Sequence, residues 1–263
     1  MAFQSSQFLD DFAWHSPFAT SSQPELADEL RAHFITHRPY FNDIIKFNEP
    51  APATSQTLYQ WAQPAALTSL LACYSDHIYR NQPQLAREGK PLKSLWAQWY
   101  LGLLVPPLVM ALITQPRALD IGPQHIHVEF HETGRAATFW IDVQEDRVAT
   151  TQPLQQRIEK LLVEGLMPVV EALENSGEIN GKLIWSNTGY LLNWFFGELR
   201  ELLDDATIAE LRHACFFEKQ LRDGQDNPLY RTVILREGLL VRRTCCQRYK
   251  LPDVQGCGDC TLK

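Results

Sequence analysis

The amino-acid sequence predicts an α+β protein: a large, mainly helical domain with one β-hairpin, then a small C-terminal hairpin and a cysteine-rich loop. Three observations lead to this class. Apolar residues recur at helical spacing over most of the 263 residues. Residues 124–143 and 229–244 instead read as strands divided by glycine turns. Four of the six cysteines lie within residues 245–260.

The first half of the chain is predicted to be helical. Ser22, Pro24 and Glu25 form a capping-box pattern for a helix that ends near His37, ahead of Pro39. A second helical pattern covers residues 57–79. Residues 94–116 carry no charged side chain and are long enough to span a bilayer of about 20 apolar residues. We expect a buried core helix there, broken or kinked at its central Pro-Pro pair, with membrane contact as the alternative.

Strand patterns interrupt the helices twice. The stretch "HIHVEFHETGRAATFWIDV" alternates polar and apolar residues and turns at "ETGR", which indicates a hairpin. Further helices are expected over 154–173, 185–203 and 207–221. A second hairpin follows, with Glu237-Gly238 at its turn. The polar segment 222–228 is the predicted boundary between a substrate-binding unit, 1–225, and a C-terminal unit, 226–263.

Composition excludes some function classes. The formal net charge of −7 argues against binding to nucleic acids, whose partners usually present a basic domain. The N-terminus lacks the basic start and apolar run of a secretory signal, so we expect a cytoplasmic protein without disulfides. The hydropathy of residues 94–116 leaves peripheral contact with the inner face of the cell membrane as an alternative.

The C-terminal cysteines have the spacing of a metal site. They form a C-C-x10-C-x2-C pattern: Cys245, Cys246, Cys257 and Cys260. Four thiolates select zinc or an iron-sulfur cluster, and a cluster with two irons accepts adjacent thiolates more easily than one tetrahedral zinc ion. From the residues alone, a structural zinc site and redox-active or unliganded thiols remain open. Cys73 and Cys215 fall in helical patterns and are predicted to be buried structural thiols.

Basic residues surround these cysteines. They are Arg242, Arg243, Arg248 and Lys250. Their charge would lower thiolate pKa values, stabilise a reduced, more negative cluster, and suit docking of an acidic electron-transfer partner. The simpler interpretation is that they are solvated strand and loop charges.

The tail "CCQRYKLPDVQGCGDC" resembles the C-terminal signature of the FhuF-type ferric hydroxamate siderophore reductases. The upstream stretches "LLACYSDHIYRNQP", "PLKSLWAQWYLGLLVPPL", "HVEFHETGR" and "GEINGKLIWSNTGYLLNW" are also similar to that family. The resemblance implies that the four cysteines hold a [2Fe-2S] cluster. It further implies a reductase that passes one electron to Fe(III) in hydroxamate siderophores and releases Fe(II). An electron donor such as a ferredoxin, a flavodoxin or a reductase would then reduce the cluster again.

Two further groups are candidates for substrate contact. Trp185, Asn187, Tyr190 and Trp194 combine aromatic surfaces with neutral hydrogen-bonding groups, as a bulky polar chelate requires. At helical spacing, core packing is the simpler interpretation of these aromatics, and of Trp96, Trp99 and Tyr100.

An alternating series, His125, His127, Glu129 and His131, is predicted to share one face of a strand. This face could line the substrate pocket, with His127 and His131 as contacts, or bind a divalent metal in a different class of enzyme beside a structural zinc knuckle. A non-enzymatic iron-sulfur carrier is the third class. The simplest interpretation is a half-buried strand with a wet face, because residues two apart spread too widely for all four to reach one ion.

Overall fold

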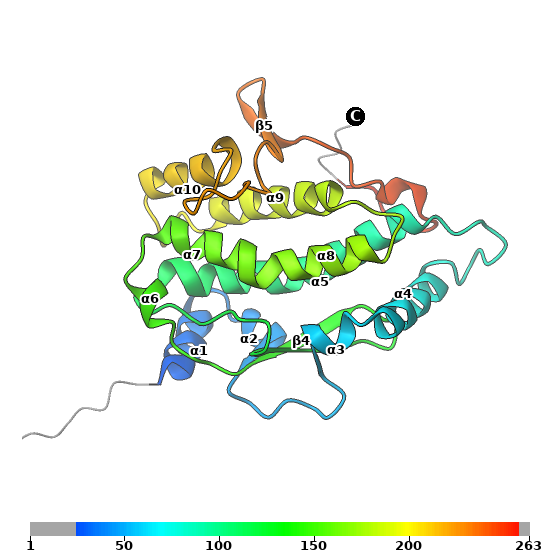
Figure 1. Cartoon of the computed structure of the whole chain (residues 1–263), viewed down its shortest axis with the longest axis horizontal. Coiled ribbons are helices and arrows are strands. Elements are labelled where there is room, and N and C mark those ends of the chain that lie inside the picture. The colour runs from blue at the N-terminus through cyan, green and yellow to red at the C-terminus, as the bar shows by residue number, and fades with distance from the viewer. Residues whose placement is uncertain (1–24, 258–263) are drawn as a thin grey trace, which may run out of the picture.

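The computed structural model describes residues 25–257, which form stacked layers. A small sheet with the N-terminal helices lies on one side, a long helix crosses the middle, and further helices cover its other side (Figure 1). The helices are α1 Leu26–His37, α2 Phe41–Ile44, α3 Leu58–Trp61, α4 Pro64–Ile78, α5 Gly89–Thr114, α6 Arg147–Thr150, α7 Leu154–Lys160, α8 Met167–Asn175, α9 Gly181–Glu198 and α10 Asp205–Phe217. The mixture of helices and small sheets confirms the predicted α+β class.

The long helix α5 is the buried core helix that the uncharged segment predicted. Leu104, Val105 and Leu108 are at most 1% exposed, and 72% of its most apolar 18-residue window is buried. Within the described residues it is the one helix long and apolar enough to cross a membrane. The expected break is absent: the helix continues through Pro106 and Pro107. Packing against the sheet on one side and α9 on the other compensates for the two missing N–H donors.

The other helix predictions are largely confirmed, with local corrections. Helix α1 begins after Glu25 as its N-cap residue, so the predicted capping box is wrong; Ser22 and Pro24 lie outside the described residues. The pattern at 57–79 divides into α3 and α4 at Pro64, which opens α4 as an N1 proline. The pattern at 154–173 is one continuous rod in which a π-helical segment, Leu161–Leu166, joins α7 to α8.

The first hairpin is the centre of a four-stranded sheet. Strands β3 Ile126–Phe130 and β4 Ala136–Ile141 pair antiparallel, as predicted, and Gly134 has the positive φ of 77° that the turn needs. Two short strands complete the order β1-β4-β3-β2: β1 Ile45–Phe47, parallel to β4, and β2 Gln56–Thr57, antiparallel to β3. These edge strands were not predicted, because two or three residues carry no readable alternation.

The second hairpin follows the predicted pattern and projects from the top of the molecule (Figure 1). Strands β5 Val233–Arg236 and β6 Leu239–Arg242 are antiparallel, and Glu237 and Gly238 both have positive φ, which is typical of a type I′ turn. The hairpin packs on α9. After β6 the chain passes through a 3-10 turn, Arg248–Lys250, and lies against α5.

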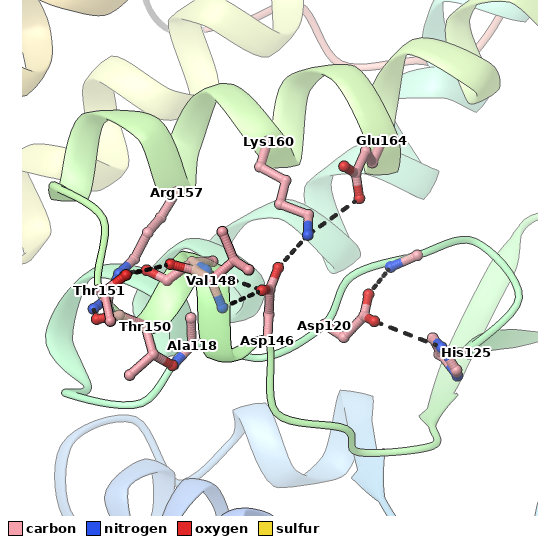
Figure 2. A network of polar contacts seen from close by, with 12 residues as sticks. Ala118, Asp120, His125, Asp146, Val148, Thr150, Thr151, Arg157, Lys160 and Glu164 are labelled. Carbon is pink, nitrogen blue, oxygen red and sulfur yellow. Dashed lines mark hydrogen bonds and ion pairs between the residues drawn. The ribbon is translucent and has the colours of Figure 1, made fainter.

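A polar network joins the C-terminal end of α5 and both ends of α6 to side chains of α7 (Figure 2). Arg157, buried, donates to five backbone carbonyls: Leu112, Gln115, Pro116, Ala149 and Thr150. Asp146 caps α6 by accepting from the N–H groups of Val148 and Ala149, and it pairs with Lys160. These contacts satisfy helix ends that would otherwise be buried with unpaired carbonyls and N–H groups, so their role is structural.

Candidate metal centre and the pocket beside it

Three of the four predicted ligands lie in the described residues, and two of their sulfurs face each other. Cys246 is 1% exposed, and its Sγ lies 3.9 Å from the Sγ of Cys257. A tetrahedral ion with metal–sulfur bonds of about 2.3 Å holds two thiolates about 3.8 Å apart. The spacing of this pair therefore suits ligation of one metal ion.

Cys245 precedes this pair and is partly buried. The backbone N–H of Gln247 donates to its Sγ at 3.3 Å, and Gln247 has the positive φ of 65° that turns the chain back after two adjacent cysteines. Cys260 lies outside the described residues. Within residues 25–257 no group of three or more His, Cys, Asp or Glu side chains is already assembled around one point.

Arg242 is a cation in contact with one of these sulfurs. It is 5% exposed; its guanidinium donates to Cys257 Sγ at 3.5 Å and to Asn187 Oδ1 at 3.3 Å. Burial by itself lowers the pKa of Arg242, but its interactions with Cys246 and Cys257 outweigh burial and raise that pKa above its usual value. A negatively charged sulfur stabilises a buried guanidinium more than a neutral thiol does, so this contact suits cysteines that act as metal ligands.

Two buried arginine donors in this part of the molecule are unused. The Nε atoms of Arg242 and Arg248 are buried and have no hydrogen-bond partner within the described part of the chain. Buried donors are normally satisfied, so an additional acceptor is expected there. Bridging sulfide and cysteine sulfurs are acceptors and carry negative charge. The donor set and the orphaned N–H groups therefore fit an iron-sulfur cluster.

Polar residues on α5 and α9 anchor the cysteine loop. Ser94, 0% exposed, donates through Oγ to the carbonyl of Cys246 at 3.0 Å and accepts from Asn187 Nδ2 at 3.0 Å. Thr244 donates to Ser186 Oγ at 2.7 Å. Ser94, Ser186 and Thr244 were not predicted as site residues, and Asn187 was predicted only as a substrate contact. Ser94 and Gln98, one helical turn apart in an otherwise apolar segment, were the available signal.

A cavity of about 260 Å³ opens beside Cys257, between α5 and α9. It is called the α5–α9 pocket here. Its lining is mainly apolar and aromatic, with few polar groups: Ala97, Gln98, Leu101, Gly102, Ile184, Asn187, Thr188, Tyr190, Leu191, Trp194, Arg242, Arg248 and Cys257. The guanidinium carbon of Arg242 lies 5.3 Å from the ring centre of Tyr190, within cation–π range.

Of the four residues suggested for substrate contact in residues 185–194, three line this pocket and one does not. Trp194 is 49% exposed at the pocket, and Tyr190 lies one helical turn before it. Asn187 also lines the pocket, but its amide already contacts Ser94 and Arg242. Trp185 is buried and lies on a different side of α9, beside Ser186.

The histidine series lies elsewhere, on the sheet. His127 in β3 pairs with Asp142 at 3.5 Å, and His125 lies 3.8 Å from Asp120. His131 follows β3, and its Nδ1 accepts from the backbone N–H of Thr133. None of these histidines lines the α5–α9 pocket. The predicted alternation is present, with Ile126 and Val128 buried on the opposite face.

The basic residues near the cysteines separate into different surroundings. Arg242 is buried against the sulfurs, whereas Arg243 is exposed on the other side of α9. Arg248 lines the α5–α9 pocket and donates to Gln98 Oε1 at 3.3 Å. Lys250 pairs with Glu88 at 3.3 Å on the surface. The sequence cluster is therefore not one patch.

Burial was predicted correctly for some of the remaining cysteines and aromatics and wrongly for others. Cys215 is buried, as expected, and burial raises its pKa to about 12. Cys73 is exposed on α4, so its predicted burial is wrong. Trp96 and Tyr100 are core residues, but Trp99 is 40% exposed under the guanidinium of Arg135.

Comparison with known proteins gives the same picture. Residues 94–240 match the family described as ferric iron reductase FhuF-like transporter, and residues 242–262 match the FhuF 2Fe-2S C-terminal domain. The chain belongs to the FhuF family. It is 60% identical, over the full length of both chains, to the ferric siderophore reductase of Escherichia coli (strain K12).

Membership explains the centre described above. Family members carry a [2Fe-2S] cluster in the C-terminal domain, so this is an iron-sulfur oxidoreductase that acts on ferric siderophores. The matched C-terminal segment includes all four cysteines of the predicted ligand set.

Proposed function

We propose that this siderophore-iron reductase delivers one electron to Fe(III) held by hydroxamate siderophores in the α5–α9 pocket. The observation that carries the proposal is that Cys257, a predicted cluster ligand, shares this pocket with Tyr190 and Trp194. Hydroxamate oxygens hold Fe(III) strongly and Fe(II) much more weakly, so one-electron reduction releases the metal without cleaving the carrier. When bound, the cluster supplies the one-electron redox centre, held by Cys245, Cys246, Cys257 and Cys260.

The pocket's own residues have distinct proposed roles. Trp194 and Tyr190 offer flat apolar surfaces to the carbon chains that link the hydroxamates, and the guanidinium of Arg248 offers donors to their oxygens. The proposed role of Asn187 is to hold Arg242 in position, not to contact the substrate. A volume of about 260 Å³ admits one face of a chelate. Electron transfer needs only close approach, so no acid or base is required.

The pocket lies between the two predicted units. Its helical walls come from residues 1–225, whereas Arg242, Arg248 and Cys257 come from residues 226–263. We propose the first unit as the main siderophore-binding part and the second as the cluster-binding part. We also propose a cytoplasmic location, and a protein electron donor such as a ferredoxin, a flavodoxin or a reductase.

Replacing Trp194 tests the pocket. Under anaerobic conditions, with the ferric complex of desferrioxamine B and a chelator that reports Fe(II), Trp194→Ala should raise KM about tenfold. One large aromatic contact is worth about 1–2 kcal/mol. The kcat value should change less than about twofold, because electron transfer to the bound chelate is retained.

Tyr59→Ala is the matched control, since Tyr59 is a 61% exposed aromatic on α3 that does not line the pocket. An unchanged KM in Trp194→Ala, or an equal rise in Tyr59→Ala, would exclude the α5–α9 pocket as the binding site. Repeating the assay with a catecholate complex tests the hydroxamate preference.

A further inference from the structure

We propose that a second hollow, on the other side of α9, docks an acidic electron-carrier protein. This basic groove has a volume of about 640 Å³. Its charged lining residues are Lys182, Lys219, Arg231 and Arg243, against one carboxylate, Asp226. The inference rests on the proposed function, because it names the surface by which the reductase is reloaded.

Helix α9 separates the two hollows. Ile184, Asn187, Thr188, Leu191 and Trp194 line the α5–α9 pocket, whereas Lys182, Trp185 and Ser186 line the basic groove. Both sets follow the three- and four-residue spacing of a helix face, so they form two neighbouring stripes on the same helix. The cysteine loop contacts both hollows, through Cys257 in one and Thr244 in the other.

The groove ends at Thr244, the residue next to the first predicted ligand. Thr244 precedes Cys245, and its hydroxyl donates to Ser186 Oγ at 2.7 Å on the groove wall. A carrier seated in the groove would therefore lie next to the cysteine loop without covering the pocket for the siderophore. In each cycle the carrier is oxidised by one electron and the reductase is reduced by one, which Fe(III) then accepts.

The charge of the groove favours an acidic partner. All four cations are exposed, and within residues 25–257 no carboxylate forms an ion pair with any of them. The whole chain carries −7, so a local excess of positive charge directs a negatively charged carrier to this face.

Lys182 supports a binding role. It is the second residue of α9, where the positive end of the helix dipole disfavours a cation. Packing does not require it, since it is exposed. A charge that costs helix stability at this position is consistent with a role in binding rather than folding.

Charge reversal tests the proposal. The holoprotein is titrated with an oxidised, acidic plant-type [2Fe-2S] ferredoxin by calorimetry, at low and at physiological ionic strength, with no siderophore present. The double variant Lys182→Glu/Arg243→Glu should weaken binding at least about tenfold at low salt, and the affinity of the wild type should fall as salt rises. Cluster absorbance should be unchanged, which separates docking from cluster loss.

The control is Arg147→Glu/Arg200→Glu, two exposed arginines with the same total charge change. Arg200 lies beyond the far end of α9, which is about 24 Å from Lys182 along the helix axis. The ferredoxin affinity of this control variant should stay within about twofold of wild type.

Equal weakening in both variants, or salt-independent binding, would overturn the docking site. Saturable binding of NADPH that depends on Lys182 and Arg243, without ferredoxin binding, would also overturn it in favour of a nucleotide reductant. Because no siderophore is present, failure of the proposed substrate site leaves these outcomes unaffected.

Discussion

Arg242 places a buried positive charge beside the sulfur of Cys257. Its guanidinium is buried, faces Cys257 and is held from behind by Asn187, which is in turn held by Ser94. A fixed cation stabilises the reduced form of a cluster more than the oxidised form, because reduction adds one negative charge. We therefore propose that the chain Ser94–Asn187–Arg242 helps to set the reduction potential.

Arg242→Gln should lower the reduction potential by about 60–120 mV. One unit charge near the cluster at an effective dielectric of about 20–40 contributes about 1.4–2.8 kcal/mol, and 59 mV is a factor of ten for one electron. EPR-monitored redox titration measures the shift. Arg243→Gln, at an exposed position, is the control and should shift the potential much less. A potential unchanged in Arg242→Gln would contradict the assigned role.

At the scale of elements, one glycine of α9 lets the β5–β6 hairpin pack closely against the helix. A Cβ at Gly189 would lie 2.1 Å from Thr232 Oγ1 and 2.8 Å from its Cβ. Thr232 directly precedes β5, so the contact sets how closely the hairpin approaches the helix. The hairpin leads directly into Cys245 and Cys246.

Gly189→Ala should therefore displace the hairpin and lower cluster content. Overpacking costs typically about 1–3 kcal/mol, more than the helix propensity that alanine adds. Iron and sulfide per chain, together with the thermal midpoint, measure the effect. Gly197→Ala is the control in the same helix: its Cβ meets only the end of Arg212 at 3.4 Å, so it should be neutral or stabilising. Full cluster content in Gly189→Ala would show that the close approach is not needed.

The contacts of Asp146 should make the stability of the protein depend on pH. Burial of this carboxyl opposes its ionisation, but hydrogen bonds from the N–H of Ala149 and from Lys160 outweigh burial and lower its pKa. A carboxyl with a lowered folded-state pKa contributes stability that is present above its unfolded pKa of about 3.9 and is lost as the pH falls through the folded pKa.

Asp146→Asn should thus destabilise the protein by about 1 kcal/mol at pH 7, because asparagine keeps the N-cap oxygen but loses the negative charge that pairs with Lys160 and faces the helix N-terminus. The difference from wild type should shrink as the pH falls below about 4. Urea denaturation across this pH range measures it, and acid loss of the cluster affects both proteins alike. A difference independent of pH would mean that the charge of Asp146 is not what stabilises α6.

For the whole molecule, the sequence predicted what local rules determine. Both hairpins follow from their glycine turns, and the buried helix follows from its uncharged run. The grouping of Cys246 with Cys257 agrees with the cysteine spacing. What local rules do not encode was missed: β1 and β2 exist only through pairing with the hairpin strands, and α5 stays continuous at Pro106 because of tertiary packing.

The same limit applies to the site. Tyr190 and Trp194 could be selected as candidates by residue type, but only the fold shows that they share a pocket with Cys257 while Trp185 and His127 do not. Ser94 and Arg242 are 148 residues apart in the chain, and their link through Asn187 depends on how α5, α9 and β6 pack. A single sequence can mark such polar residues as unusual, but it does not show which distant residues they contact.

The central claim is that a ferric hydroxamate binds in the α5–α9 pocket and is reduced there. The most direct measurement is anaerobic stopped-flow mixing of dithionite-reduced holoprotein, freed of excess dithionite, with ferric desferrioxamine B. We expect cluster reoxidation to saturate with chelate concentration, to be inhibited competitively by the redox-inert gallium complex, and to lose affinity in Trp194→Ala. Reoxidation that stays linear in chelate and ignores gallium would contradict the claim.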